Sequence, residues 1–142
     1  MDKRFMENLQ MNDFSIESLA VTAIVFILAY FLGSIPFGIL ISKFFGLGNL
    51  RKLGSGNIGA TNVLRTGNRL AALLTLILDA SKGLLGVILA RFISEDAAIT
   101  ASVCVILGHI YPIWLKFVGG KGVATFVGIL ISINIYLSLI HI

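Results

Sequence analysis

Four long apolar segments dominate the sequence, and each is long enough to cross a bilayer as a helix. They run over about residues 19–45, 70–93, 97–118 and 123–142. A helix needs roughly 20 residues to cross a hydrocarbon core about 30 Å thick. Hydrophobic residues make up 57% of the chain, and only 13% of the residues are charged. This composition excludes a soluble nucleotide-binding domain. We therefore expect an all-α, polytopic transmembrane helix bundle over residues 19–142, preceded by a leader over residues 1–18.

The distribution of charge predicts the orientation of these spans. Residues 2–17 hold four acidic residues against two basic ones, and Glu95 and Asp96 occupy the second connection. Basic residues gather instead in the first and third connections: Lys43, Arg51, Lys52, Arg65, Arg69, Lys116 and Lys121. The positive-inside rule places these two connections in the cytoplasm and the N-terminus outside. We attribute the excess of basic over acidic residues to cytoplasmic loops that lie beside anionic lipid, and we expect no nucleic-acid partner.

The first connection contains an unusual polar stretch, GSGNIGATNVLRTGNR, here called the first glycine loop (residues 54–69). It begins with a G-x-G-x-x-G pattern, but a membrane helix precedes it where a dinucleotide fold needs a strand. Ala60 also stands where a phosphate-binding loop needs lysine. Glycine-rich backbone still forms anion-binding concavities, and the stretch carries no acid. We expect phosphate contacts from Arg65 and from Gly54, Ser55, Gly56, Asn57, Gly59, Thr61 and Asn62.

The third connection contains a second glycine-rich stretch, FVGGKGVAT, here called the second glycine loop (residues 117–125). Gly119, Gly120 and Gly122 free the backbone, and Lys121 adds a point charge among them. By itself, this pattern is also typical of a turn between antiparallel helices. Because it faces the same compartment as the first glycine loop, we interpret it as a second anion contact.

Several polar residues interrupt the apolar segments. Asp79 and Lys82 stand three residues apart, so they share a helix face and can pair; we favour a structural ion pair over a substrate contact. His109 favours a hydrogen bond between helices over a role as a base. We expect Gly33, Ser34, Pro36 and Gly38 to kink the first span and allow close packing. We interpret Cys104 as a packing residue, and the residue spacing predicts no metal site and no cofactor.

Together, the stretches LGSIPFG, GSGNIGATNVLRTG, LDASKG, LGHIYPIW and KFVGGKGVATFVG closely resemble the bacterial acyl-phosphate:glycerol-3-phosphate acyltransferases, the PlsY family. The resemblance covers about residues 19–128. It implies an enzyme of the bacterial cell membrane in phospholipid synthesis. The family transfers a fatty acyl group from acyl phosphate to glycerol 3-phosphate, which gives 1-acyl-glycerol 3-phosphate and phosphate. Membrane lipids and the enzyme that makes acyl phosphate are the implied partners.

The chemistry of this reaction assigns expected roles to four residues. Both substrates carry phosphate, so we expect Arg65 and Lys121 to hold phosphates. Ser55 and Asn57, together with loop amides, would stabilise developing charge. Neither loop contains a His, Asp or Glu that could act as a base, and the phosphate of the donor is the expected proton acceptor.

The chain also departs from the family pattern. Members typically have about seven spans and a third cytoplasmic motif with His, Asn and Glu, whereas this chain ends at Ile142 after four spans. We therefore expect it to lack the C-terminal third of the family. Two alternative functions follow. One is an anion or phosphate transport subunit, which inverted repeats would support, and the other is a non-catalytic remnant of the acyltransferase.

Overall fold

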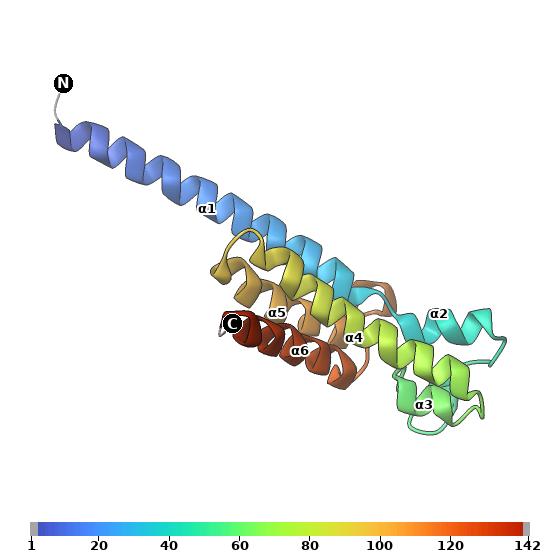
Figure 1. The fold of residues 1–142 in the computed structure, drawn as a ribbon. Coiled ribbons are helices and arrows are strands. Elements are labelled where there is room, and N and C mark those ends of the chain that lie inside the picture. The colour runs from blue at the N-terminus through green and yellow to red at the C-terminus, as the bar shows by residue number, and fades with distance from the viewer. Residues whose placement is uncertain (1–2, 141–142) are drawn as a thin grey trace.

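The computed structural model describes residues 3–140, and every regular element in this range is helical (Figure 1). Four long helices form a bundle: α1 (Lys3–Ser34), α4 (Arg69–Arg91), α5 (Glu95–Ile110) and α6 (Val123–Ile140). The connections contain two short helices, α2 (Phe37–Phe44) and α3 (Ala60–Leu64), and two single turns, η1 (Leu50–Lys52) and η2 (Ile113–Leu115). The N-terminal part of α1 extends beyond the bundle, and α2 and α3 lie at the opposite end (Figure 1). The all-α prediction is confirmed.

Three of the four predicted spans are matched by segments long and apolar enough to cross a membrane. Among the described residues, these segments are Ile16–Phe44, Arg69–Arg91 and Glu95–Leu115. The fourth predicted span corresponds to α6, which contains the apolar helical segment Val123–Asn134. The last two residues of that prediction, 141–142, lie outside the described residues. A fourth crossing therefore stays a prediction.

The segment expected to be a leader is helical from Lys3 and continues without a break into the first span. Residues 1–2 lie outside the described range. Its position on the outer side of the membrane stays a prediction.

The first predicted span is broken at Pro36, as LGSIPFG indicated. Helix α1 ends at Ser34, and α2 begins at Phe37 after a Pro36 whose ψ of 72° is not helical. A proline disfavours helical backbone in the residue before it, here Ile35, and it has no N–H to donate. The break leaves the carbonyl of Ile35 available, and the ammonium of Lys82 donates to it at 3.0 Å.

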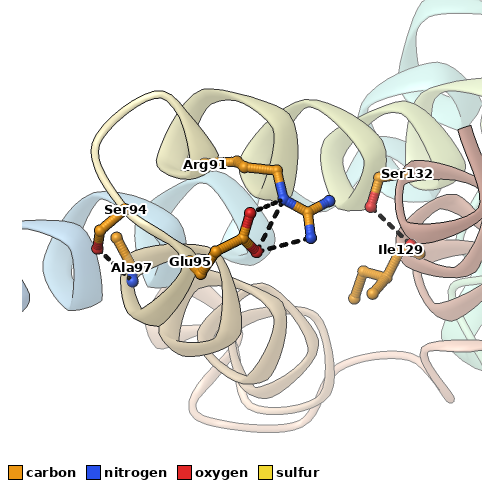
Figure 2. Close-up of polar contacts among 6 residues, drawn as sticks. All are labelled: Arg91, Ser94, Glu95, Ala97, Ile129 and Ser132. Carbon is orange, nitrogen blue, oxygen red and sulfur yellow. Dashed lines mark hydrogen bonds and ion pairs between the residues drawn. The ribbon is translucent and has the colours of Figure 1, made fainter. Parts of the chain in front are cut away.

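Side-chain caps fix the connection between α4 and α5. The hydroxyl of Ser94 accepts a hydrogen bond from the Ala97 N–H at 3.0 Å, and Arg91 pairs with Glu95 at 2.8 Å (Figure 2). A hydroxyl at this position satisfies one of the unpaired N–H groups that begin every helix. The acidic first turn of α5 also complements the helix dipole. These contacts make the chain reverse direction within three residues.

Small residues let the long helices approach closely. A Cβ added at Gly33 of α1 would lie 2.1 Å from the Val105 carbonyl of α5, and one at Gly108 would lie 2.2 Å from the Tyr30 carbonyl. Gly83 of α4 packs in the same way against the backbone of α6, and Gly128 of α6 packs against the backbone of α4. The outer faces carry exposed apolar side chains, among them Leu28, Leu73, Leu89, Ile99 and Val103. Close glycine contacts inside and apolar side chains outside are typical of helices packed in lipid.

Candidate functional site

The first glycine loop is folded around the buried side chain of Asn62. Its Nδ2 donates to the carbonyls of Leu50 at 2.9 Å and Asn57 at 2.8 Å, and its Oδ1 accepts from the Ser55 N–H at 3.3 Å. The amide therefore uses its hydrogen-bonding groups within the protein. The side chain of Asn62 thus holds the loop in shape, and a contact of Asn62 with phosphate stays a prediction.

Three glycines of this loop adopt backbone angles that favour glycine. Gly54 has φ of 53°, Gly56 has φ of 68° and Gly67 has φ of 85°. A Cβ at Gly54 would lie 2.5 Å from the guanidinium of Arg65. The arginine side chain therefore packs directly against the backbone of Gly54. Arg65 and Ser55 both remain exposed and open to a ligand. The N–H of Gly56, by contrast, donates to the Leu53 carbonyl at 2.9 Å.

The second glycine loop folds back on the C-terminal end of α5. The N–H of Gly119 donates to the Ile110 carbonyl at 2.8 Å, and the N–H of Gly120 donates to the His109 carbonyl at 3.1 Å. These bonds satisfy carbonyls that a helix end leaves unpaired. The two amides are thus engaged within the protein, and an anion contact at Gly119 and Gly120 stays a prediction. Lys121 is exposed, and Gly122 has φ of 75°.

Gly120 also lies against the ring of His109. A Cβ at Gly120 would be 2.1 Å from His109 Nε2, and the buried ring has little room to move because it is 5% exposed. We expect Gly120→Ala to destabilise the detergent-solubilised protein by about 1–2 kcal/mol, since overpacking forces the ring aside. An unfolding titration followed by circular dichroism measures this. Lys121→Ala, one residue further on and exposed, is the control and should stay within about 0.5 kcal/mol of the wild type. Equal stability of the two variants would contradict the packing argument.

Arg51 joins the two loops, although the sequence indicated only its charge. Its Nη2 donates to the Val118 carbonyl, and its Nη1 donates to the Gly56 carbonyl at 3.5 Å. The two loops therefore lie at the same end of the bundle, and their position in the cytoplasm stays a prediction. No local signal could have found this contact, because it depends on how distant helices pack.

A cavity of about 420 Å³ lies where the two loops meet α4, α5 and α6. Leu76, Ile77 and Val127 form part of its apolar wall. Its lining includes seven residues that are polar or glycine: Asn57, Gly59, Thr61, Asp79, His109, Lys121 and Gly122. The other predicted site residues lie outside this lining: Gly54, Ser55, Gly56, Asn62, Arg65, Gly119 and Gly120. The structure thus brings part of the predicted set together around one space.

The buried end of the cavity is polar. Lys82 Nζ lies 2.9 Å from Asp79 Oδ1 and 5.7 Å from the centre of the Phe37 ring. The predicted ion pair between Asp79 and Lys82 is confirmed, and both side chains are at most 4% exposed. His109 Nδ1 approaches the same carboxylate oxygen at 3.6 Å. From the sequence we expected His109 to make a hydrogen bond between helices, and we did not predict that it lies beside Asp79. The signal in the sequence was that His109 and Asp79 each interrupt an apolar segment.

Fold and site together define a polytopic helical membrane protein with a polar cavity between two glycine loops at the ends of its helices. The sequence model of the family described as glycerol-3-phosphate acyltransferase matches residues 23–142. The chain belongs to this family, as its motifs predicted.

Named relatives and solved structures agree with this assignment. The glycerol-3-phosphate acyltransferase of Cereibacter sphaeroides is 64% identical over 108 residues, which are 75% of this chain and 51% of the relative. That of Dinoroseobacter shibae is 63% identical over 113 residues, 79% of this chain and 56% of the relative. The chain spans about half the length of the curated relatives it matches.

The fold is similar to crystal structures of PlsY, an integral membrane glycerol 3-phosphate acyltransferase. The glycerol 3-phosphate form has a TM-score of 0.75 at 37% identity and covers 84% of this chain and 60% of PlsY. The lysophosphatidic acid form has a TM-score of 0.73 at 35% identity over the same shares. This chain is accordingly an integral membrane protein with helical spans.

Proposed function

We propose that this chain carries the phosphate-handling site of an enzyme that transfers a fatty acyl group from acyl phosphate to glycerol 3-phosphate. The products are 1-acyl-glycerol 3-phosphate and phosphate. The observation that carries the proposal is that Asn57 and Thr61 of the first glycine loop line the same cavity as Lys121 of the second. The similar PlsY structures, which hold glycerol 3-phosphate and lysophosphatidic acid, support it.

The electrostatics of the cavity suit a phosphorylated ligand. Lys121 supplies a positive charge at the exposed end, and Thr61 and Asn57 add neutral donors. Neither glycine loop contains an acid. The one carboxylate in the lining, that of Asp79, is paired with Lys82, so its repulsion of an anion is reduced.

The reaction needs little from the protein beyond positioning and charge stabilisation. Acyl phosphate is already an activated donor: the glycerol hydroxyl forms an ester bond to the acyl carbon, and the bond from that carbon to the phosphate oxygen breaks. Lys121 and the exposed Arg65 hold the two phosphates, and Ser55 and Asn57 donate to the oxygen that gains charge. The departing phosphate takes the proton of the hydroxyl. The enzyme works with both glycine loops in the cytoplasm and receives acyl phosphate from the enzyme that makes it.

We expect Lys121→Ala to weaken glycerol 3-phosphate binding about 10- to 100-fold, the effect of losing one charge-assisted hydrogen bond. Calorimetric titration of the purified 142-residue chain in detergent measures the affinity. Release of phosphate from acyl phosphate, with acyl-CoA as the control donor, measures turnover. Lys52→Ala removes the same charge at an exposed position outside the cavity lining and should bind as the wild type does.

Three outcomes are informative in this experiment. Release of phosphate that requires glycerol 3-phosphate and Lys121 would support the whole proposal. Binding without release would support the site but not catalysis by this chain alone. Equal affinity in the Lys121→Ala and Lys52→Ala variants would rule Lys121 out as the phosphate contact.

A further inference from the structure

The cavity between the loops has two chemically different ends. At the exposed end, Lys121 and Thr61 offer a positive charge and a hydroxyl. At the buried end, Asp79 is 3% exposed and His109 is 5% exposed. A ligand that fills the space therefore meets both an exposed cation and a buried carboxylate.

The polar atoms of the buried end are incompletely bonded. His109 Nδ1 lies 3.6 Å from Asp79 Oδ1, which is too long for a hydrogen bond. Neither atom has a hydrogen-bond partner of good geometry among the described residues, although Asp79 Oδ1 has Lys82 as its ion-pair partner. Buried polar atoms without partners are costly, so a ligand that supplies a hydrogen bond here gains affinity.

A hydroxyl group fits these atoms, whereas a phosphate does not. A hydroxyl donates its proton to the carboxylate and accepts from a neighbouring N–H. A phosphate at the same place would face the charge of Asp79 at close range in a poorly solvated site. The volume of about 420 Å³ falls within the usual range of small-molecule pockets.

We propose that Asp79 and His109 form a hydroxyl-binding subsite that makes the cavity selective for polyol phosphates over simple alkyl phosphates. The inference rests on the proposed function and extends it by assigning the recognition of the glycerol part. The phosphate lies at the Lys121 end, and one hydroxyl of the glycerol part donates to Asp79. Lys82 Nζ, 2.9 Å from Asp79 Oδ1, holds the carboxylate in place and so acts as a positioning residue.

The test compares ligands that differ only in hydroxyl groups. Affinities of the full 142-residue chain in detergent are measured for inorganic phosphate, n-propyl phosphate and glycerol 3-phosphate. The wild type should bind glycerol 3-phosphate about tenfold more tightly than n-propyl phosphate, the usual effect of one hydrogen bond to a charged group. The analogues 2-hydroxypropyl phosphate and 3-hydroxypropyl phosphate then show which hydroxyl is recognised. This comparison needs no substitution, so it does not depend on whether any variant folds.

Two matched double variants separate hydrogen bonding from charge. Asp79→Leu with Lys82→Met removes the ion pair and the acceptor atom, whereas Asp79→Asn with Lys82→Met removes the pair but keeps an acceptor oxygen at the same place. We expect the first variant to lose the tenfold preference with its affinity for n-propyl phosphate unchanged. The second should retain part of the preference, because a neutral acceptor oxygen remains.

The outcomes distinguish this inference from the proposed function. If glycerol 3-phosphate and n-propyl phosphate bind the wild type equally well, the subsite is wrong but the phosphate site stands. Retention of the preference after Asp79→Leu with Lys82→Met would also overturn the subsite. Failure of the folded chain to bind any of the three phosphates would overturn both proposals.

Discussion

Replacing Asp79 alone by alanine is expected to destabilise the folded chain by about 3–5 kcal/mol. The substitution leaves the ammonium of Lys82, whose side chain is 1% exposed, without its counter-charge. Among the described residues, its remaining hydrogen bond is to the Ile35 carbonyl at the break between α1 and α2. With only this neutral carbonyl and the Phe37 ring, 5.7 Å away, near it, the buried charge is far from compensated. The protein must therefore admit water there, deprotonate the lysine or unfold.

Removing both charges together should cost much less. Asp79→Leu with Lys82→Met replaces the pair by apolar groups of similar size, which is often close to neutral for a buried ion pair. Titration of the helical circular dichroism with a denaturing detergent, at constant lipid and salt, measures the difference between the variants. If Asp79→Ala were no less stable than the double variant, the ion pair would be unimportant for the fold.

Much of the architecture could be predicted because the signals are local. The length and hydropathy of each segment indicated a helix, and Pro36 indicated the break in the first span because proline constrains its own neighbours. The spacing of Asp79 and Lys82 placed both on one helix face before any tertiary contact was considered.

The candidate site could be predicted only in part, because its geometry depends on contacts between distant segments. Residue type indicated that the two glycine loops act together, and Asn57 of the first and Lys121 of the second do line one cavity. It could not show that Asn62 and the amides of Gly119 and Gly120 are engaged within the protein. Nor could it show that Arg51 connects the loops. Glycines in a motif are equally compatible with anion binding and with tight packing, and only the packing decides.

A bulky residue at Gly108 should give the second large loss of stability. Gly108 of α5 lies against the backbone of α1, and an added Cβ would be 2.2 Å from the Tyr30 carbonyl and 2.9 Å from the Ser34 N. Backbone atoms cannot rotate aside as a side chain can, so the helices must separate. We expect Gly108→Val to destabilise the chain by about 3 kcal/mol or more, at the upper end of overpacking effects.

Separation of α1 and α5 should also change the shape of the cavity, because His109 follows Gly108 directly and its ring lines the cavity. Gly108→Val is therefore expected to weaken glycerol 3-phosphate binding, even at temperatures where the variant is still folded. Val103→Ile adds bulk to the exposed face of the same helix, where the wild-type side chain is 54% exposed, and should change neither property. The comparison is made by the same unfolding titration and by calorimetric binding. Wild-type stability in Gly108→Val would mean that the two helices do not approach at this glycine, and the position of His109 would then need another explanation.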